Sequence, residues 1–254
     1  MTARHVPAYA VRLGRGPHDR AAAQRLRYEV FCAEMGADGP LVDHAARVEI
    51  DRFDDHAEHL LLEDRAAAAP DRLVGLYRVI EGQAASDFSS SDEFDLAPLI
   101  ATRRPLLELS RSCLRADHRG GMAMFHLWRA LADEIARRGT AILFGVASFR
   151  GTDAGAIALP LAHLHRHHRA PLGLRVTSRV PVQPAEPVSM DTAAAMRATP
   201  ALIKAYLRMG GGIGQGAFVD HAFGTTDVCM VLDTASPNAR RASIHGRSAM
   251  RAAR

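Results

Sequence analysis

The segment that most constrains the fold is 105–148, where two apolar strand patterns flank an amphipathic helix pattern. PLLELSRSCLR (105–115) predicts a strand, and AILFGVAS (141–148) predicts a fully buried one. Between them, AMFHLWRALADEIARRG (123–139) predicts a helix, because its apolar residues recur every three or four positions. The residues that form this stripe are Met124, Leu127, Trp128, Leu131, Ala132 and Ile135. A strand, a helix and a further strand in this order are typical of α/β proteins.

The rest of the chain extends this pattern to both sides. Further strands are predicted at 9–15, 59–64, 72–82, 174–182 and, as two candidates, within 217–233. Further helices are predicted at 19–36, with Asp19 as N-cap and Gly36 as its end, at 155–168, with a break at Pro160, and at 200–211. Together they predict one α/β domain over residues 1–239, with a mixed sheet flanked by helices and a helical, glycine-rich C-terminal third.

The composition indicates a soluble globular protein. Of the 254 residues, 48% are hydrophobic and 24% charged, and no apolar run is long enough to span a bilayer. The N-terminus lacks a signal-peptide pattern, so we expect a cytoplasmic location. Cys32, Cys113 and Cys229 are too few and too far apart for a disulfide framework or a zinc site.

The C-terminal segment 240–254 is a basic tail. RRASIHGRSAMRAAR has five arginines and no acidic residue. Such a tail suits an acidic protein partner or an anionic membrane surface, and we expect no nucleic-acid partner. The alternative interpretation is a disordered tail that binds nothing.

Glu108 is the first candidate for chemistry, because it lies within a strand pattern. A buried carboxylate is costly unless it is paired or used, so Glu108 is either the ion-pair partner of Arg111 or a catalytic base. Strand alternation places Glu108 and Ser110 on one face and Arg111 on the other, unless a β-bulge redirects Arg111. Arg119, Gly120 and Gly121 then precede a helix N-terminus, which is a favourable place for an anion.

Two further motifs favour ordinary structure over function. His163 and His167 have helical i, i+4 spacing, but no acidic residue accompanies them, which favours a basic surface segment over a metal site. GGGIGQG (210–216) lacks the Gly-Lys-Ser/Thr ending of a phosphate loop and predicts a flexible loop.

The order of elements resembles the GNAT acyltransferase fold, in which the Arg119–Gly120–Gly121 loop would hold the donor's pyrophosphate. Met122 and Met124 stand where that family has glycines. Bulky residues leave less room for a pyrophosphate, so the resemblance points away from CoA and toward phosphopantetheine on acyl carrier protein. No cofactor is expected beyond this phosphopantetheine, which enters with the donor.

Four ordered segments resemble the acyl-homoserine-lactone synthase branch: LRYEVFCAEMG, EIDRFDDHAEHLL, LVGLYRVIEG and LELSR. The family's motifs fall on Arg27, Phe31, Asp51, Asp54, Arg78, Glu108, Ser110 and Arg111. A tryptophan of that branch is missing where this chain has Met35 and Gly36, which speaks against a S-adenosylmethionine site.

Blocks over roughly residues 20–235 are similar to the ornithine N-acyltransferases of bacterial ornithine-lipid synthesis, among them ELSRSCLRADHRGG, LFGVASFRGTD and PALIKAYLRMGG. The resemblance implies transfer of a 3-hydroxyacyl chain from acyl carrier protein to the α-amine of ornithine, giving lyso-ornithine lipid. Such an amphiphilic product suits an enzyme that works at the cytoplasmic face of the inner membrane. The alternatives are another N-acyl amino acid synthase or a non-catalytic acyl-carrier or lipid-binding module.

The same resemblance assigns roles to the candidate residues. The catalytic set is Glu108 as base, with Ser110 and Arg111; Arg119, Gly120 and Gly121 bind the phosphopantetheine; Arg27, Phe31, Asp51 and Asp54 bind the acceptor. In this assignment Arg27 holds the acceptor's carboxylate as a bidentate fork, and the acidic residues suit its positive charge. No residue is assigned to a metal.

Overall fold

The computed structural model describes residues 6–69, 71–182 and 191–236. The chain groups into two compact units. The N-terminal unit comprises Met1–Ile80 and Leu109–Arg138, and the C-terminal unit comprises Glu81–Glu108 and Gly139–Arg254. The predicted tail at 240–254 lies outside the described residues.

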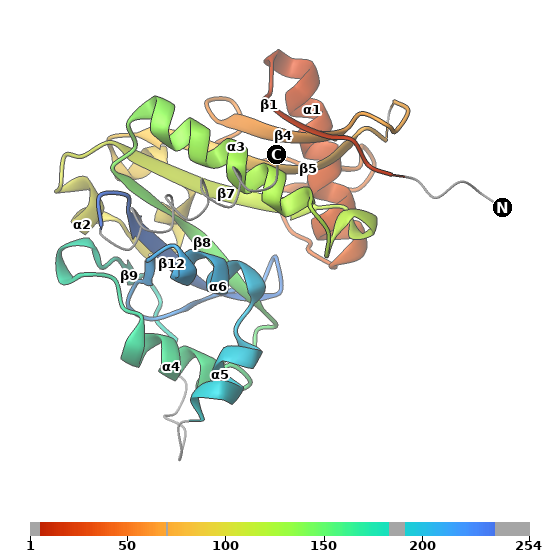
Figure 1. Ribbon diagram of the computed structural model, residues 1–254. Coiled ribbons are helices and arrows are strands. Elements are labelled where there is room, and N and C mark those ends of the chain that lie inside the picture. Colours follow the sequence, from red (N-terminus) through yellow and green to blue (C-terminus); the bar gives the residue numbers. More distant parts are fainter. Residues whose placement is uncertain (1–5, 70, 183–190, 237–254) are drawn as a thin grey trace. The chain divides into compact units, whose positions relative to one another are not determined.

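The N-terminal unit contains most of the residues of the first five strands and two of the α-helices (Figure 1). Its elements are β1 (Tyr9–Leu13), α1 (Gly16–Arg27), a π-helix (Tyr28–Glu34), β2 (Val42–Asp43), β3 (Val48–Glu49), β4 (Glu58–Asp64), most of β5 (Leu73–Gly82), the second part of β7 (Leu106–Leu114), a 3₁₀ turn (Ala116–His118) and α3 (Ala123–Arg138). The strand order is β1-β4-β5-β7, and β1 and β5 both run antiparallel to β4.

The C-terminal unit contains the remaining elements. They are two 3₁₀ turns (Ala85–Asp87 and Ser89–Asp92), β6 (Phe94–Asp95), α2 (Ala97–Ile100), the first part of β7, β8 (Ile142–Arg150), α4 (Ala158–His167), a 3₁₀ turn (Leu172–Leu174), β9 (Thr177–Ser178), α5 (Thr192–Ala198), α6 (Ala201–Arg208), β10 (Gly212–Ile213), β11 (Phe218–Asp220) and β12 (Thr225–Asp233). Here the strand order is β7-β8-β12-β10, with β11 also paired to β12. Because β7 and β8 are parallel and β12 is antiparallel to β8, the predicted mixed sheet is confirmed.

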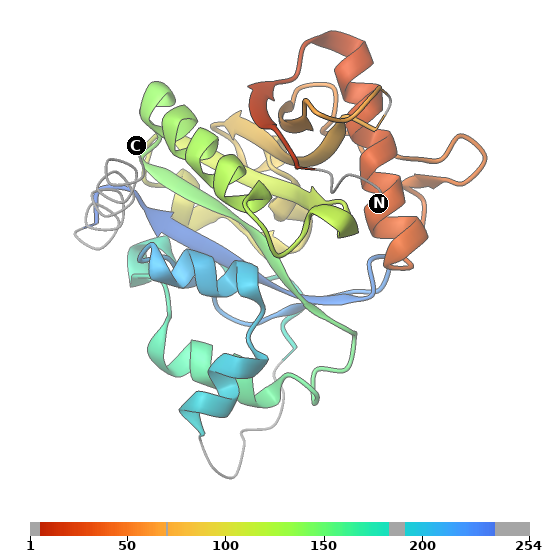
Figure 2. The same cartoon turned by 45° about the vertical axis from the view of Figure 1, so that its right-hand side comes forward.

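Alternation along β5 explains how helices cover both faces of the N-terminal sheet. Leu76 belongs to the core cluster that α1 contributes to through Ala23 and Leu26. The next residue, Tyr77, therefore faces the opposite side. Its ring lies edge-on to Trp128 of α3, with 6.1 Å between ring centroids. In the C-terminal unit, α6 packs on β8 and β12, and α4 packs on α5 (Figure 2).

The first helix differs from the prediction. The α-helix starts at Gly16, with Arg15 as N-cap, and gives way to the π-helix after Arg27, so the N-cap prediction for Asp19 is wrong. The Asp19 carboxylate instead accepts a hydrogen bond of 2.6 Å from the Arg15 N–H and pairs with Arg12. Gly36, at φ +82°, follows the helical segment as predicted.

Several predictions for the C-terminal unit are also corrected. Pro160 does not break α4, because it lies in the first turn, where a backbone N–H has no helical partner. The strand predicted over 174–182 is much shorter in the structure, where only Thr177–Ser178 forms a strand, β9. Part of the predicted 210–216 loop is strand β10, where Gly212 is required because a Cβ there would lie 2.6 Å from the Ala170 nitrogen. In the N-terminal unit, Ala132 of the predicted stripe is exposed.

Candidate active site

Six charged side chains of the N-terminal unit form a buried ion cluster. It consists of three arginines and three carboxylates: Arg27, Arg78, Arg111, Glu49, Asp51 and Asp54. Ten site residues were predicted from the sequence. Four of them are members of this cluster: Arg27, Asp51, Asp54 and Arg111. The cluster is balanced, with three positive and three negative charges.

Arg27 lies at the junction between α1 and the π-helix and is fully buried. Its guanidinium binds both carboxylate oxygens of Asp54, at 2.7 and 2.6 Å, and its Nε lies 2.5 Å from Glu49. Burial alone would raise the pKa of Asp54, but the hydrogen bonds and charge of Arg27 hold it well below its usual range. Because Arg27 is already bound to Asp54, an acceptor carboxylate that binds Arg27 would compete with Asp54.

Arg78 of β5 connects Asp51 to β7. It is fully buried, its Nη1 lies 2.5 Å from both oxygens of Asp51, and its Nε donates to Ser110 Oγ at 2.9 Å. Burial, followed by the charge of Arg111, lowers the pKa of Arg78. Its Nη2 lacks a hydrogen-bond partner among the described residues, which leaves one buried donor for a ligand or a water.

Arg111 reaches the same cluster because its backbone is left-handed, with φ +50°. Its Nε lies 3.1 Å from Glu49 and its Nη2 lies 3.1 Å from Asp51. Regular alternation would send Ser110 and Arg111 to opposite faces, but Ser110 contacts Arg78, which binds Asp51, and Arg111 contacts Asp51 itself. The redirection of Arg111 that the sequence left open therefore occurs.

His59 and a cavity adjoin Asp54. Burial, followed by the charge of Arg27, lowers the pKa of His59 to about 4, so it is neutral at neutral pH. A cavity of about 250 Å³ is lined by both residues and by Gly14, Gly16, Pro17, Arg20, Asp55, Ala57 and Glu58. Phe31, predicted to contact the acceptor, packs against the core cluster of the N-terminal unit.

Glu108 belongs to the C-terminal unit, where it binds two serines. The side chain is fully buried. Its Oε1 accepts hydrogen bonds from Ser89 Oγ at 2.8 Å and from the N–H and Oγ of Ser90 at 2.8 and 2.5 Å, and its Oε2 accepts one from the Ser89 N–H at 2.7 Å. From its polar, turn-rich sequence the stretch 83–95 is predicted to be a surface loop, and this interpretation misses both serines as partners of Glu108.

The predicted anion loop is open at its glycines. Gly120 has φ +76°, and a Cβ at Gly120 or Gly121 would meet nothing within 4 Å. The Arg119 guanidinium pairs with the exposed Glu34 and donates to the Leu114 carbonyl at 2.7 Å. Of the two methionines in the motif, Met122 is 56% exposed, whereas the Sγ of Met124 lies 4.0 Å from the Tyr77 hydroxyl. Met122 is therefore the more exposed of the two methionines, and Met124 is half-buried.

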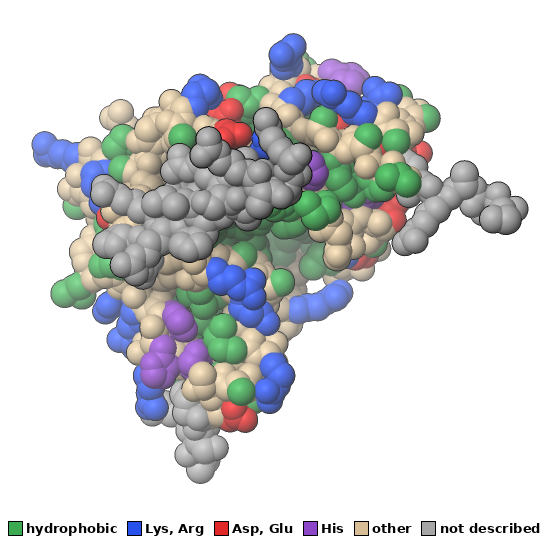
Figure 3. Space-filling model, viewed as in Figure 1, with side chains coloured by type: hydrophobic (Ala, Val, Ile, Leu, Met, Phe, Trp, Pro, Cys, Tyr) green, Lys and Arg blue, Asp and Glu red, His purple; other side chains and the backbone are tan. Residues whose placement is uncertain are grey.

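The predicted histidine segment is only partly at the surface. Histidine and arginine side chains gather over α4 and α5 (Figure 3), but His163 is buried, and burial lowers its pKa. The interpretation as a basic surface segment is therefore wrong for His163, while His167 is exposed.

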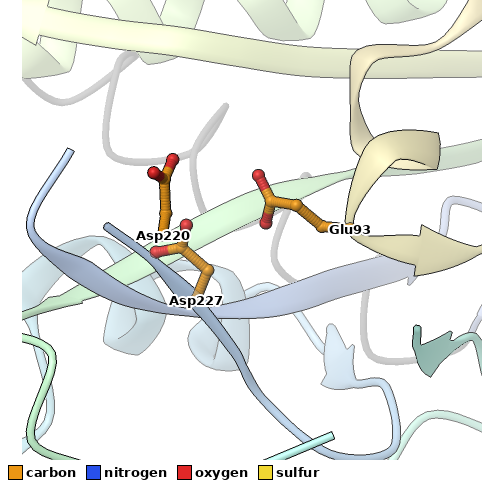
Figure 4. Close-up of side chains that lie close together, drawn as sticks. All are labelled: Glu93, Asp220 and Asp227. Carbon is orange, nitrogen blue, oxygen red and sulfur yellow. The ribbon is translucent and has the colours of Figure 1, made fainter. Parts of the chain in front are cut away.

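Three carboxylates of the C-terminal unit, missed by the sequence analysis, form a second charged group. Glu93, Asp220 and Asp227 offer oxygens that all lie within 4.8 Å of one another (Figure 4). Glu93 follows the 3₁₀ turn Ser89–Asp92, Asp220 lies on β11 and Asp227 lies on β12. Because they come from separate segments, no motif spacing in the sequence predicts that they meet. We call them the acidic triad.

The comparisons with known proteins identify the family. A model described as acetyltransferase (GNAT) domain matches residues 26–129. An L-ornithine N(alpha)-acyltransferase of Rhodobacter capsulatus is 49% identical, over 89% of this chain and 90% of that protein. The chain belongs to the L-ornithine N(alpha)-acyltransferase family. A member of this family from Brucella abortus is 35% identical, over 95% of this chain and 90% of that protein. The protein is thus an acyltransferase, as predicted.

Solved structures confirm the predicted GNAT fold for this member of the L-ornithine N(alpha)-acyltransferase family. An N-acyl amino acid synthase from uncultured soil microbes matches with a TM-score of 0.53 at 13% identity, over 90% of this chain and 92% of that one. A CoA-dependent acyl-homoserine lactone synthase also matches with a TM-score of 0.53, at 14% identity, over 94% and 90% of the two chains. At these identities the match establishes the fold alone.

Proposed function

We propose that this protein transfers a 3-hydroxyacyl chain from acyl carrier protein to the α-amine of ornithine, giving lyso-ornithine lipid. The observation that carries the proposal is the 49% identity, over 89% of the chain, to a protein named L-ornithine N(alpha)-acyltransferase. The motif residues that suggest the activity are also built into ordered structure: Arg27, Asp51, Asp54 and Arg111 lie in the ion cluster, and Ser110 is bound by Arg78.

The reaction needs a base, because an ammonium has no lone pair with which to attack a thioester. We assign this role to Glu108. An ionised carboxylate offers about four acceptor sites. Oε1 already accepts three hydrogen bonds and Oε2 only one, so Oε2 keeps capacity for the ammonium or for a bridging water. Once the proton has left, the amine attacks the thioester carbonyl, the amide bond forms and the phosphopantetheine thiolate leaves.

The ion cluster then serves to fix the backbone around the motif residues. Arg78 and Arg111 bind the same carboxylate, Asp51, and Arg78 also binds Ser110. Because the three arginines balance the three carboxylates, removing one carboxylate leaves one buried positive charge uncompensated. In this proposal the cluster keeps Ser110 and Arg111 in one orientation, and Arg78 Nη2 is the donor that remains for a bound group.

For the donor we propose that the phosphate of phosphopantetheine binds at Arg119, Gly120 and Gly121, next to the N-terminus of α3. Backbone N–H groups and an open glycine surface suit one phosphodiester. The fold does not select the donor, since one protein of the same fold is described as CoA-dependent. No further cofactor is part of the proposal.

We also propose that the enzyme acts at the inner membrane surface, where its amphiphilic product can leave. No described helix has the length and apolarity to cross a bilayer. Contact would therefore be peripheral, and the basic segment 240–254 supplies charge for it.

The proposed function is tested with purified protein, 3-hydroxyacyl carrier protein and a panel of amino acids, with products measured by mass spectrometry. We expect an N-acylated ornithine. Acylation of homoserine lactone or of another amino acid, but not of ornithine, would contradict ornithine as the acceptor. The absence of any acylated product would support a non-catalytic carrier-binding module.

A further inference from the structure

The acidic triad lies on one face of the hairpin formed by β11 and β12. The register pairs Asp220 with Thr225 and Phe218 with Asp227, and paired residues of antiparallel strands point to the same side. Thr225 and Asp227, two apart on β12, also share that side. Glu93 approaches from the end of the 3₁₀ turn Ser89–Asp92, and Figure 4 shows the three carboxyl groups converging.

A buried hydroxyl accompanies the triad. Thr225 is 8% exposed, and its Oγ1 lacks a hydrogen-bond partner within the described residues. Since Thr225 lies directly opposite Asp220, its side chain stands beside the carboxylates. An unsatisfied buried hydroxyl is costly and calls for a ligand or a water. A ligand at this place would meet carboxylate oxygens and one hydroxyl, a set that accepts hydrogen bonds and favours positive charge.

The triad is linked to Glu108 through short structural connections inside the C-terminal unit. Glu108 binds Ser89 and Ser90, and the turn that contains them ends at Glu93. Glu108 is paired with Phe144, which is paired with Val231, so Asp227, four residues before Val231 on β12, lies on the same sheet face as Glu108. Cys229 lies on β12 between Asp227 and Val231, and burial, followed by the charges of Glu108 and Glu93, raises its pKa.

We propose that Glu93, Asp220 and Asp227, with the Thr225 hydroxyl, bind the side-chain ammonium of a dibasic amino-acid acceptor. The inference rests on the proposed function and deepens it. An ammonium has three donors and no acceptor, which matches an all-acceptor site. The acceptor would place its side-chain ammonium at the acidic triad and its α-amine at Glu108. The enzyme would therefore favour amino acids that carry two amines. Neutral amino acids and lactones lack the group that the triad binds.

The test compares ornithine with norvaline, which has the same carbon skeleton without the terminal amine. Asp227→Asn and Glu93→Gln each remove one negative charge from the triad, and Thr225→Val removes the hydroxyl. Asp233→Asn is the matched control, because Asp233 lies on the same strand and pairs with Arg104. The folding of each variant is checked by circular dichroism and thermal unfolding. If Asp227→Asn, at a buried position, does not fold, the comparison is made with Glu93→Gln, at a half-buried position.

In the wild type and in Asp233→Asn we expect kcat/KM for ornithine to exceed that for norvaline. In Asp227→Asn and Glu93→Gln we expect the ratio of the two to fall about 10-fold or more, as for loss of a charge-assisted hydrogen bond. An unchanged ratio in folded variants overturns the ammonium site. Wild-type activity that requires added Mg²⁺ or Ca²⁺, together with calorimetric binding of that ion lost in Asp227→Asn, also overturns it in favour of a metal site.

Binding separates the inference from the proposed function. Ornithine and norvaline are titrated into the wild type and the variants by calorimetry, without donor. If no acceptor is acylated but ornithine binds to the wild type and more weakly to Glu93→Gln, the proposed function fails and the ammonium site stands. If ornithine is acylated yet binds no differently from norvaline, the function stands and the ammonium site is overturned.

Discussion

Glu108→Gln separates a catalytic from a structural role for this carboxylate, because the structure allows its structural cost to be worked out. Glutamine keeps one oxygen and replaces the other with an NH₂ group. The least costly orientation keeps the oxygen at Oε1, with its three hydrogen bonds, and places the NH₂ at Oε2, against the Ser89 N–H. A buried N–H without an acceptor costs about 1–3 kcal/mol, and three bonds weaken when the acceptor loses its charge.

Together these changes predict that unfolding free energy falls by about 2–4 kcal/mol. A domain with ordinary stability, about 5–15 kcal/mol, survives this loss. Loss of a general base costs about 10²–10⁴-fold in rate, which is far more than the fraction of unfolded protein can explain. The expected result is therefore a folded variant with a modest shift in urea midpoint and a large loss of kcat.

The matched control is Ser89→Ala combined with Ser90→Ala, which removes two hydroxyl donors to Glu108 and keeps the carboxylate. Hydrogen bonds to a charged group contribute about 1.5–3 kcal/mol each, so the pair is destabilised at least as much as Glu108→Gln. Activity is measured with carrier-protein donor and ornithine, at a temperature at which urea unfolding shows both variants folded. Equal losses of kcat in the two variants would refute the base assignment and leave Glu108 as the anchor of the serine turn.

Three further predictions concern pH, donor and tail. His59 has a folded pKa of about 4, below the usual value, so the unfolded chain binds a proton that the folded one does not between about pH 6.5 and 4. Stability should therefore fall by on the order of 3 kcal/mol as pH falls through this window, and urea unfolding of His59→Gln should show a clearly smaller fall; an equal fall would contradict the assignment. Acyl carrier protein should be preferred over the same acyl-CoA, and Met122→Gly should narrow the gap in kcat/KM; comparable values in the wild type would remove the argument. Deleting 240–254 should weaken binding to anionic liposomes while activity on soluble substrates is kept, and unaltered liposome binding would show that the segment has no role there.

The elements with strong periodicity could be predicted from sequence. Strands β5, β7 and β8 and helix α3 agree with their predictions to within a residue or two at most ends, because their apolar patterns are long. The short β10 could not be predicted, because it depends on close packing of Gly212 against Ala170. That packing is a tertiary contact and leaves no local pattern.

Some residues of the candidate site could be named from sequence motifs, but their contacts could not be predicted. Sequence motifs pointed to Arg27 and Asp54 as acceptor-binding residues, but the sequence does not show that the fold buries Arg27 against Asp54. Likewise Ser89 and Ser90 lie in a stretch whose composition indicates a surface loop, and their partner Glu108 is far along the chain. Long-range pairing of polar groups has no periodicity to detect.

The balance of the ion cluster has a consequence for how this protein can diverge. Any single change of charge at Arg27, Glu49 or Asp54 leaves a buried charge uncompensated, at a cost of about 3–5 kcal/mol. A simultaneous change of both partners avoids most of that cost. Substitutions in the cluster should therefore appear in pairs across related sequences, and a library that randomises Arg27 and Asp54 together should yield folded variants that libraries of either position alone lack.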